Sequence, residues 1–108
     1  MKFDFRFIRE SNHKLNFDVT VAVFRIVQEG INNILKHASA KNVELNVLDK
    51  EDSIYVLLKD DGHGFDRMER ANAGLGLRSM TERAKLLSGS VDIHSDGEGT
   101  VVEVYIPL

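Results

Sequence analysis

The sequence predicts a two-layer α+β sandwich, in which a mixed, mostly antiparallel sheet carries its helices on one face. Two observations lead to this fold class. Segments with strand periodicity occur as neighbouring pairs joined by short polar turns, which favours antiparallel neighbours over the alternation of a doubly wound parallel sheet. Two longer segments have helical periodicity, with apolar sides that a sheet would cover. The expected order is strand, long helix, two strands, helix and two strands.

The chain opens with a segment that alternates between apolar and charged residues. Phe3, Phe5 and Phe7 fall on one side of residues 2–8, and charged residues fall between them. Period-two alternation is typical of a strand with one buried face, so we expect a half-buried strand here. Residues 9–17 are polar and are expected to form a loop.

The longest periodic segment covers residues 18–38. Its apolar residues recur at steps of three and four, at Val23, Val27, Ile31, Ile34, Leu35 and Ala38. This spacing is typical of one apolar stripe along an α-helix. Asp18 is the expected N-cap, because its carboxylate can accept a hydrogen bond from a backbone N–H of the first turn.

The remaining elements are expected to be two strand pairs, separated by a loop and a second helix. The four strands are predicted at residues 42–48, 53–59, 90–95 and 100–106. Residues 60–74 have the composition of a loop, and residues 76–88 resume helical spacing. Gly89 follows this helix, at the position where a helix C-terminus favours glycine.

Length, charge and cysteine content exclude several classes of protein. The 108 residues suffice for one domain with a single core, and 43% hydrophobic and 29% charged residues are typical of a globular chain. A formal net charge of −3 argues against non-specific nucleic-acid binding, which needs a basic surface. There is no cysteine, so disulfides and thiolate zinc sites are excluded. No apolar run reaches the ~20 residues of a membrane span, and no signal peptide is evident. We therefore expect a cytoplasmic domain.

Four polar side chains fall on one face of the long helix. Glu29, Asn33, Lys36 and His37 are spaced so that they point the same way over little more than two turns. Carboxylate and amide oxygens suit a hard cation such as Mg²⁺, and a lysine suits a phosphate. A solvated helix face with ordinary side-chain pairs is the alternative, and this segment alone leaves both open.

Three glycine-containing segments add weaker signals. The run Asp60-Asp61-Gly62-His63-Gly64 follows an apolar strand, and its glycines let the backbone approach a ligand closely. The run Gly74-Leu75-Gly76-Leu77 opens the second helix, where free backbone N–H groups favour an anion. The run Gly97-Glu98-Gly99-Thr100 precedes the last strand. Each alone also fits an ordinary turn or helix start.

Together and in this order, these segments resemble the nucleotide-binding boxes of sensor histidine kinases. Phe24 to Ala38 resembles the N box, Asp60 to Gly64 the DxGxG box, and Gly74 to Leu77 the GxGL box. The resemblance covers roughly residues 16–108 and points to the GHKL ATPase superfamily, which has the Bergerat fold. Gly76 to Ala84 is similar to the second helix of short-lid sensor kinases of the DesK, LiaS and NarX kind.

The resemblance implies a site for ATP and Mg²⁺. Asn33 would ligate Mg²⁺, with Glu29 as a second ligand or polarising base. Lys36 would contact phosphate, and His37 would line the same face. Asp60 would accept a hydrogen bond from the adenine amine.

The other implied contacts involve the glycine-rich segments and the last strand: Gly62, Gly64, Gly74, Gly76, Leu77 and Thr100. Gly64 would give the base room, the GxGL backbone would cradle the phosphates, and Thr100 would support Asp60. Only residues 65–73 separate the two glycine boxes, and this short lid fits the subfamily.

The resemblance also implies an activity. Residues 1–108 would be an excised catalytic domain that transfers the γ-phosphoryl group of ATP to a histidine on a separate dimerisation domain. The intact protein would be a membrane-bound two-component sensor with a response regulator downstream; this domain would neither span the membrane nor bind nucleic acid. An anti-sigma-type serine kinase that works through partner binding is the alternative, and a scaffold that has lost nucleotide binding is a third hypothesis.

Overall fold

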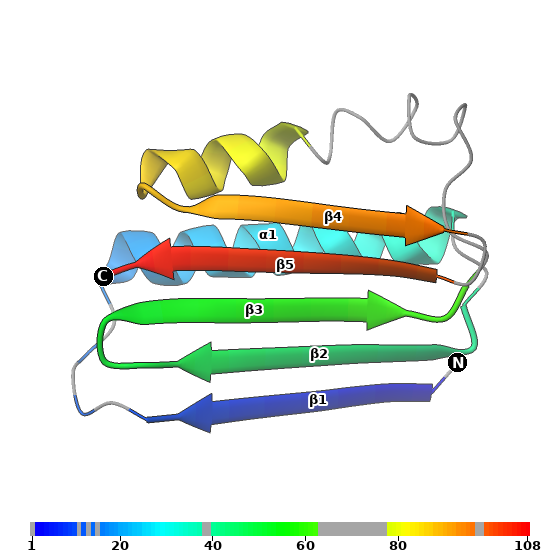
Figure 1. The fold of residues 1–108 in the computed structure, drawn as a ribbon, viewed down its shortest axis with the longest axis horizontal. Coiled ribbons are helices and arrows are strands. Elements are labelled where there is room, and N and C mark those ends of the chain that lie inside the picture. Colours follow the sequence, from blue (N-terminus) through cyan, green and yellow to red (C-terminus); the bar gives the residue numbers. More distant parts are fainter. Residues whose placement is uncertain are drawn as a thin grey trace.

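One five-stranded sheet and two helices make up the described part of the chain (Figure 1). The computed structural model describes residues 2–10, 12, 14, 16–37, 40–62, 78–96 and 99–108. The strands are β1 (Lys2–Arg9), β2 (Asn42–Asp49), β3 (Ser53–Asp60), β4 (Ser90–Asp96) and β5 (Gly99–Pro107). The helices are α1 (Phe17–His37) and a shorter one over residues 78–86. Neither described helix is long and apolar enough to cross a membrane.

The strand order is β1-β2-β3-β5-β4. β1 runs parallel to β2, whereas β2, β3, β5 and β4 pair antiparallel in succession. The chain passes through α1 between the two parallel strands, because a parallel pair needs a crossover. The predicted two-layer sandwich with a mixed sheet is confirmed.

The core fills the space between the sheet and the helices. On β2, Val43, Leu45 and Val47 alternate with more exposed residues, as expected for a strand with one covered face. From the shorter helix, Met80 and Ala84 are completely buried and join the same cluster. Both helices therefore contribute to one core.

The N-terminus of α1 is capped by a residue other than the predicted one. The side-chain Oδ1 of Asn16 accepts a hydrogen bond of 2.7 Å from the backbone N–H of Asp18. Because α1 begins at Phe17, Asn16 holds the cap position and Asp18 lies inside the first turn. The prediction of Asp18 as the cap was wrong, although its negative charge still suits the helix N-terminus.

The end of the shorter helix also differs from the prediction. Ser88, rather than Gly89, has the left-handed backbone conformation, with φ of 62°. The N–H of Gly89 donates to the carbonyl of Ala84 at 2.8 Å. A Cβ built on Gly89 would overlap the carbonyl oxygen of Tyr105, so glycine is needed here for close approach to β5.

The first strand is more exposed than predicted. All eight residues of β1 are exposed, and Phe3, Phe5 and Phe7 retain 46%, 57% and 51% of their surface. β1 is an edge strand, and Figure 1 shows α1 behind the β5 side of the sheet rather than behind β1. The prediction that residues 2–8 form a strand with one buried face is therefore wrong about burial, because no described helix covers this edge of the sheet.

Candidate functional site

A small cavity lies where α1 meets the ends of β3 and β5. Its lining combines apolar core residues with polar ones: Gly30, Asn33, Ile34, Leu58, Asp60, Met80, Thr100 and Val102. The polar members are Asn33 from α1, Asp60 from the end of β3 and Thr100 from β5. Three of the predicted site residues, distant in the sequence, therefore share one cavity.

Asn33 brings an amide into this cavity from the helix side. The residue is 9% exposed, and within the described part of the chain its buried Nδ2 has no hydrogen-bond partner. Leaving a buried polar atom unsatisfied costs free energy, and in native proteins such an atom needs an explanation, a ligand being one. Within the described residues, the Asn33 Nδ2 is therefore a buried donor with no acceptor.

The closeness of α1 to the sheet depends on Gly30, one turn before Asn33. A Cβ built on Gly30 would overlap the side chain of Leu58, which lies on β3 and is 3% exposed. The absent side chain lets the helix approach the strand closely. Gly30 therefore sets the depth at which Asn33 enters the cavity.

Asp60 brings a carboxylate from the strand side. It is 3% exposed, and its Oδ1 accepts a hydrogen bond of 2.9 Å from the backbone N–H of Gly62. The strand register places it opposite Thr100, which is 4% exposed. Gly99 has φ of +151°, and a Cβ there would overlap the carbonyl of Asp60. The start of β5 can approach Asp60 because that position is glycine.

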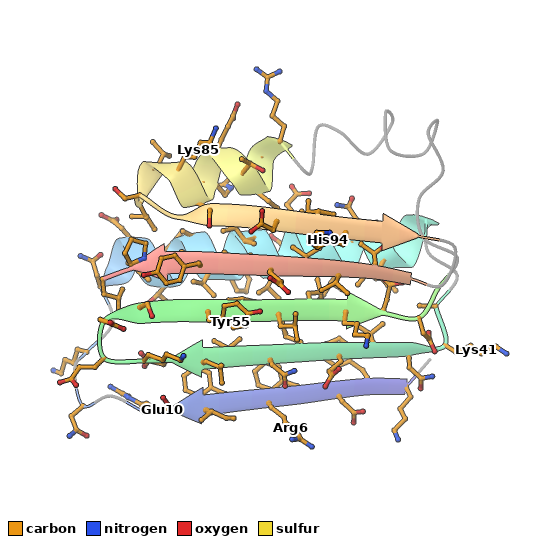
Figure 2. The ribbon with its side chains drawn as sticks, viewed as in Figure 1. Arg6, Glu10, Lys41, Tyr55, Lys85 and His94 are labelled. Carbon is orange, nitrogen blue, oxygen red and sulfur yellow. The ribbon has the colours of Figure 1, made fainter. Side chains whose placement is uncertain are left out.

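The neighbouring Asp61 fixes the same end of the sheet. Its Oδ1 accepts hydrogen bonds from the backbone N–H groups of Lys41 at 2.9 Å and Asn42 at 2.8 Å, and its Oδ2 accepts one from Asn42 Nδ2 at 2.7 Å. These bonds, led by the one from the Asn42 backbone, lower the pKa of Asp61 below its usual value. Asp61 therefore ties the end of β3 to the start of β2, where Figure 2 shows Lys41.

The structure describes the remaining predicted site residues only in part. Glu29 lies on α1, one turn before Asn33, and is half-buried. Lys36 and His37 lie in the last turn of α1, and their side chains fall outside what the structure describes. Four predicted contacts lie outside the described residues altogether: Gly64, Gly74, Gly76 and Leu77.

Three residues shape the site in ways that the sequence motifs do not predict: Gly30, Asp61 and Gly99. Gly30 could have been found, because a glycine inside a helical pattern often has a packing reason. Asp61 and Gly99 belong to the glycine-containing segments, but these segments do not indicate which backbone groups they contact. Their contacts depend on the pairing of strands, which no local pattern contains.

Comparison with known proteins settles the family. The profile of the family described as "Histidine kinase-, DNA gyrase B-, and HSP90-like ATPase" matches residues 18–108. The chain belongs to this ATPase family. The predicted family is therefore confirmed, over nearly the range that the motifs indicated.

Two bacterial relatives of this chain are both called signal transduction histidine-protein kinase/phosphatase DegS. The protein from Brevibacillus brevis is 36% identical over 91 residues, which is 83% of this chain and 24% of its own length. The protein from Bacillus subtilis (strain 168) is 35% identical over 113 residues, which is 100% of this chain and 29% of its own length. The chain thus spans under a third of either relative.

Solved structures confirm the fold. The histidine kinase domain of the Erythrobacter litoralis blue-light activated histidine kinase superposes with a TM-score of 0.78 at 23% identity, over 98% of this chain and 55% of that one. A structure of the kinase itself gives a TM-score of 0.77 at 20% identity, over 100% of this chain and 36% of that one. At such identities the likeness establishes the architecture alone.

Proposed function

We propose that this chain binds Mg-ATP beside the cavity between α1, β3 and β5, which is itself too small to enclose a nucleotide, as the catalytic domain of a two-component sensor histidine kinase. The observation that supports this is that Asn33 and Asp60, both buried and polar, line the same cavity in a chain of this ATPase family. The names of the DegS relatives support a histidine as phosphoryl acceptor.

Asp60 suits the base end of the nucleotide. A carboxylate offers several lone pairs, so it can accept a hydrogen bond from the exocyclic amine of adenine while keeping the one from Gly62. Burial and the Gly62 bond hold the side chain in one orientation, which reduces the entropy lost on binding. Thr100, opposite Asp60 in the register, supports this edge.

Asn33 and Glu29 suit the phosphate end. Among the described residues, no group of three or more His, Cys, Asp or Glu could hold a metal by itself. The phosphates of a nucleotide would supply the missing ligands, and amide and carboxylate oxygens are donors that Mg²⁺ accepts. When bound, the ion would neutralise phosphate charge. Lys36 would contact phosphate, and His37 would line the same face. Gly64 would give the base room, and the backbone of Gly74, Gly76 and Leu77 would cradle the phosphates.

The chain's part in phosphoryl transfer is positioning. The bond between the γ-phosphorus and the bridging oxygen breaks, a bond to an imidazole nitrogen of the acceptor forms, and ADP leaves. Holding base and phosphates in place orients this displacement, and little covalent chemistry is asked of the protein. The acceptor would be a histidine of a separate dimerisation domain, and a response regulator would receive the group next.

Calorimetric titration with Mg-ATP tests the binding site. Asp60→Asn should weaken binding about tenfold or more, because a hydrogen bond to a charged acceptor is lost. Asn33→Ala should remove the part of the affinity that depends on Mg²⁺. Asn32→Ala is the matched control, because Asn32 is exposed on the same helix. Unchanged affinity in both site variants would refute the assignment.

Transfer of labelled γ-phosphoryl tests the activity. The chain would be mixed with Mg-ATP and with the dimerisation domain of the same kinase, and we expect labelled histidine only when both proteins are present. Replacing the acceptor histidine by glutamine should abolish the label. Label on serine instead would favour the anti-sigma-type alternative and refute the histidine kinase.

A further inference from the structure

The outer edge of β1 has features that nucleotide binding does not use. Within the described residues, β1 pairs with β2 on one side only. The register places Phe3, Phe5 and Phe7 beside the buried Val43, Leu45 and Val47, so the phenylalanines face the core side of the sheet. A long, exposed edge strand with an apolar face is a template for pairing with another strand.

The backbone of β1 offers a regular set of hydrogen-bonding groups at this edge. The backbone N–H of Lys2 donates to the carbonyl oxygen of Lys41 at 2.7 Å, and the backbone N–H of Glu10 donates to the carbonyl oxygen of Asp49 at 2.8 Å. Both N–H groups therefore point toward β2. The register between these two bonds has no interruption. Because successive N–H groups of a strand point to opposite sides, those of Phe3, Phe5 and Phe7 point to the outer edge.

The side chains of β1 are complementary to a second copy of β1. In an antiparallel pair with Phe5 opposite the partner's Phe5, Phe3 faces the partner's Phe7, and Asp4 faces the partner's Arg6. The phenylalanines then occupy the hydrogen-bonded positions that the edge offers. Asp4 and the partner's Arg6 occupy the other positions, where opposite side chains come closest.

Other registers are less favourable. A shift of two residues along the strand places Asp4 opposite the partner's Asp4, or Arg6 opposite the partner's Arg6, and like charges directly opposite destabilise a sheet. A shift of one residue turns the partner strand over, so that each phenylalanine lies opposite a charged residue of the partner. Figure 2 shows Arg6 extending from β1 away from the rest of the sheet.

We propose that two copies of this chain associate through β1, antiparallel and centred on Phe5, to form one continuous sheet. This pairing is two-fold symmetric, so it closes at a dimer. The three half-exposed phenylalanines expose roughly 300 Å² of apolar surface per copy, which is the most that pairing at this edge could bury of them. This is well below the ~800 Å² per partner of a standard interface, so the dimer should dissociate on dilution.

Sedimentation equilibrium of the 108-residue chain, from about 10 µM to about 1 mM, tests the proposal. The average mass should rise with concentration from 12.2 kDa toward twice that value. Asp4→Arg and Arg6→Asp should each weaken association about tenfold or more, because each places like charges opposite one another. The double variant, Asp4→Arg with Arg6→Asp, should restore it.

The control is Asp92→Arg, a charge reversal at an exposed position of β4, the other edge strand. It should leave association unchanged, and circular dichroism should show that every variant is folded. A monomer throughout the range would overturn the proposal, as would a double variant that stays monomeric. Assemblies that grow beyond a dimer would show that the pairing does not close, which also overturns it.

Discussion

Gly30→Ala tests the idea that close approach of α1 to β3 builds the site. The added methyl group would overlap Leu58, which is buried and cannot turn toward solvent. Two effects oppose each other. Alanine favours a helix interior over glycine by about 1 kcal/mol. Forcing an extra carbon into a packed core costs about 1–3 kcal/mol.

The second effect should win, by about 1 kcal/mol. For 108 residues, an unfolding entropy of about 2.1 cal/mol/K per residue converts this loss into a melting temperature lower by about 4 °C. If α1 instead moves outward to relieve the overlap, Asn33 moves away from Asp60, and Mg-ATP affinity should fall as well. Gln28→Ala, at an exposed position of α1, should change stability by no more than about 0.5 kcal/mol.

A double-mutant cycle with Leu58→Ala isolates the contact. Leu58→Ala alone should cost about 2–5 kcal/mol, because it leaves a cavity under the helix. In that background the methyl of Gly30→Ala has room, so the same substitution should stabilise by about 1 kcal/mol. Chemical denaturation of all four proteins measures the reversal of sign. Gly30→Ala that stabilises the otherwise unaltered chain would refute the reasoning.

Three further predictions concern the turns and strand ends. Gly99→Ala should lower the free energy of unfolding by more than about 1 kcal/mol in urea denaturation, because its φ is positive and its Cβ would overlap Asp60. Ser88→Gly should raise the melting temperature, because a left-handed conformation costs a non-glycine residue about 1–2 kcal/mol. Asp61→Asn should destabilise the chain near neutral pH in denaturant titrations. Because folding lowers the pKa of Asp61, its stabilisation is present above the ordinary value of 3.8 and is lost as pH falls through the folded value, so the gap between the two proteins should close in acid.

Element identity was predictable because it depends on local periodicity. The helical spacing of residues 18–38 and the alternation in residues 42–48 correspond to α1 and β2 within one residue at each end. Side-chain periods of 3.6 and 2 follow from the backbone itself. In this fold, the tertiary contacts favour the same helix and strand that the local periodicity predicts.

Other features depended on neighbours that periodicity does not specify. Asn16 and Asp18 both have capping side chains, and the choice between them depended on where α1 begins. The exposure of β1 follows from its position at the edge of the sheet. Alternation in the sequence shows only which side chains share a face, and not whether that face is covered. The left-handed conformation falls on Ser88 rather than on Gly89, whereas Gly89 is required because a Cβ there would overlap β5.

The site itself separates into polar residues and the backbone that brings them together. Asn33 and Asp60 could be named from the sequence, because their chemistry is evident in the side chains. The proximity of these two side chains depends on close contact between backbones at two glycines. At Gly30, α1 approaches β3, and at Gly99, β5 approaches β3. Neither glycine needs to touch a ligand, yet a side chain at either position would separate the elements that carry the polar groups. Loss of affinity on substituting either glycine would therefore show that spacing between backbones, as much as the identity of the polar residues, determines this site.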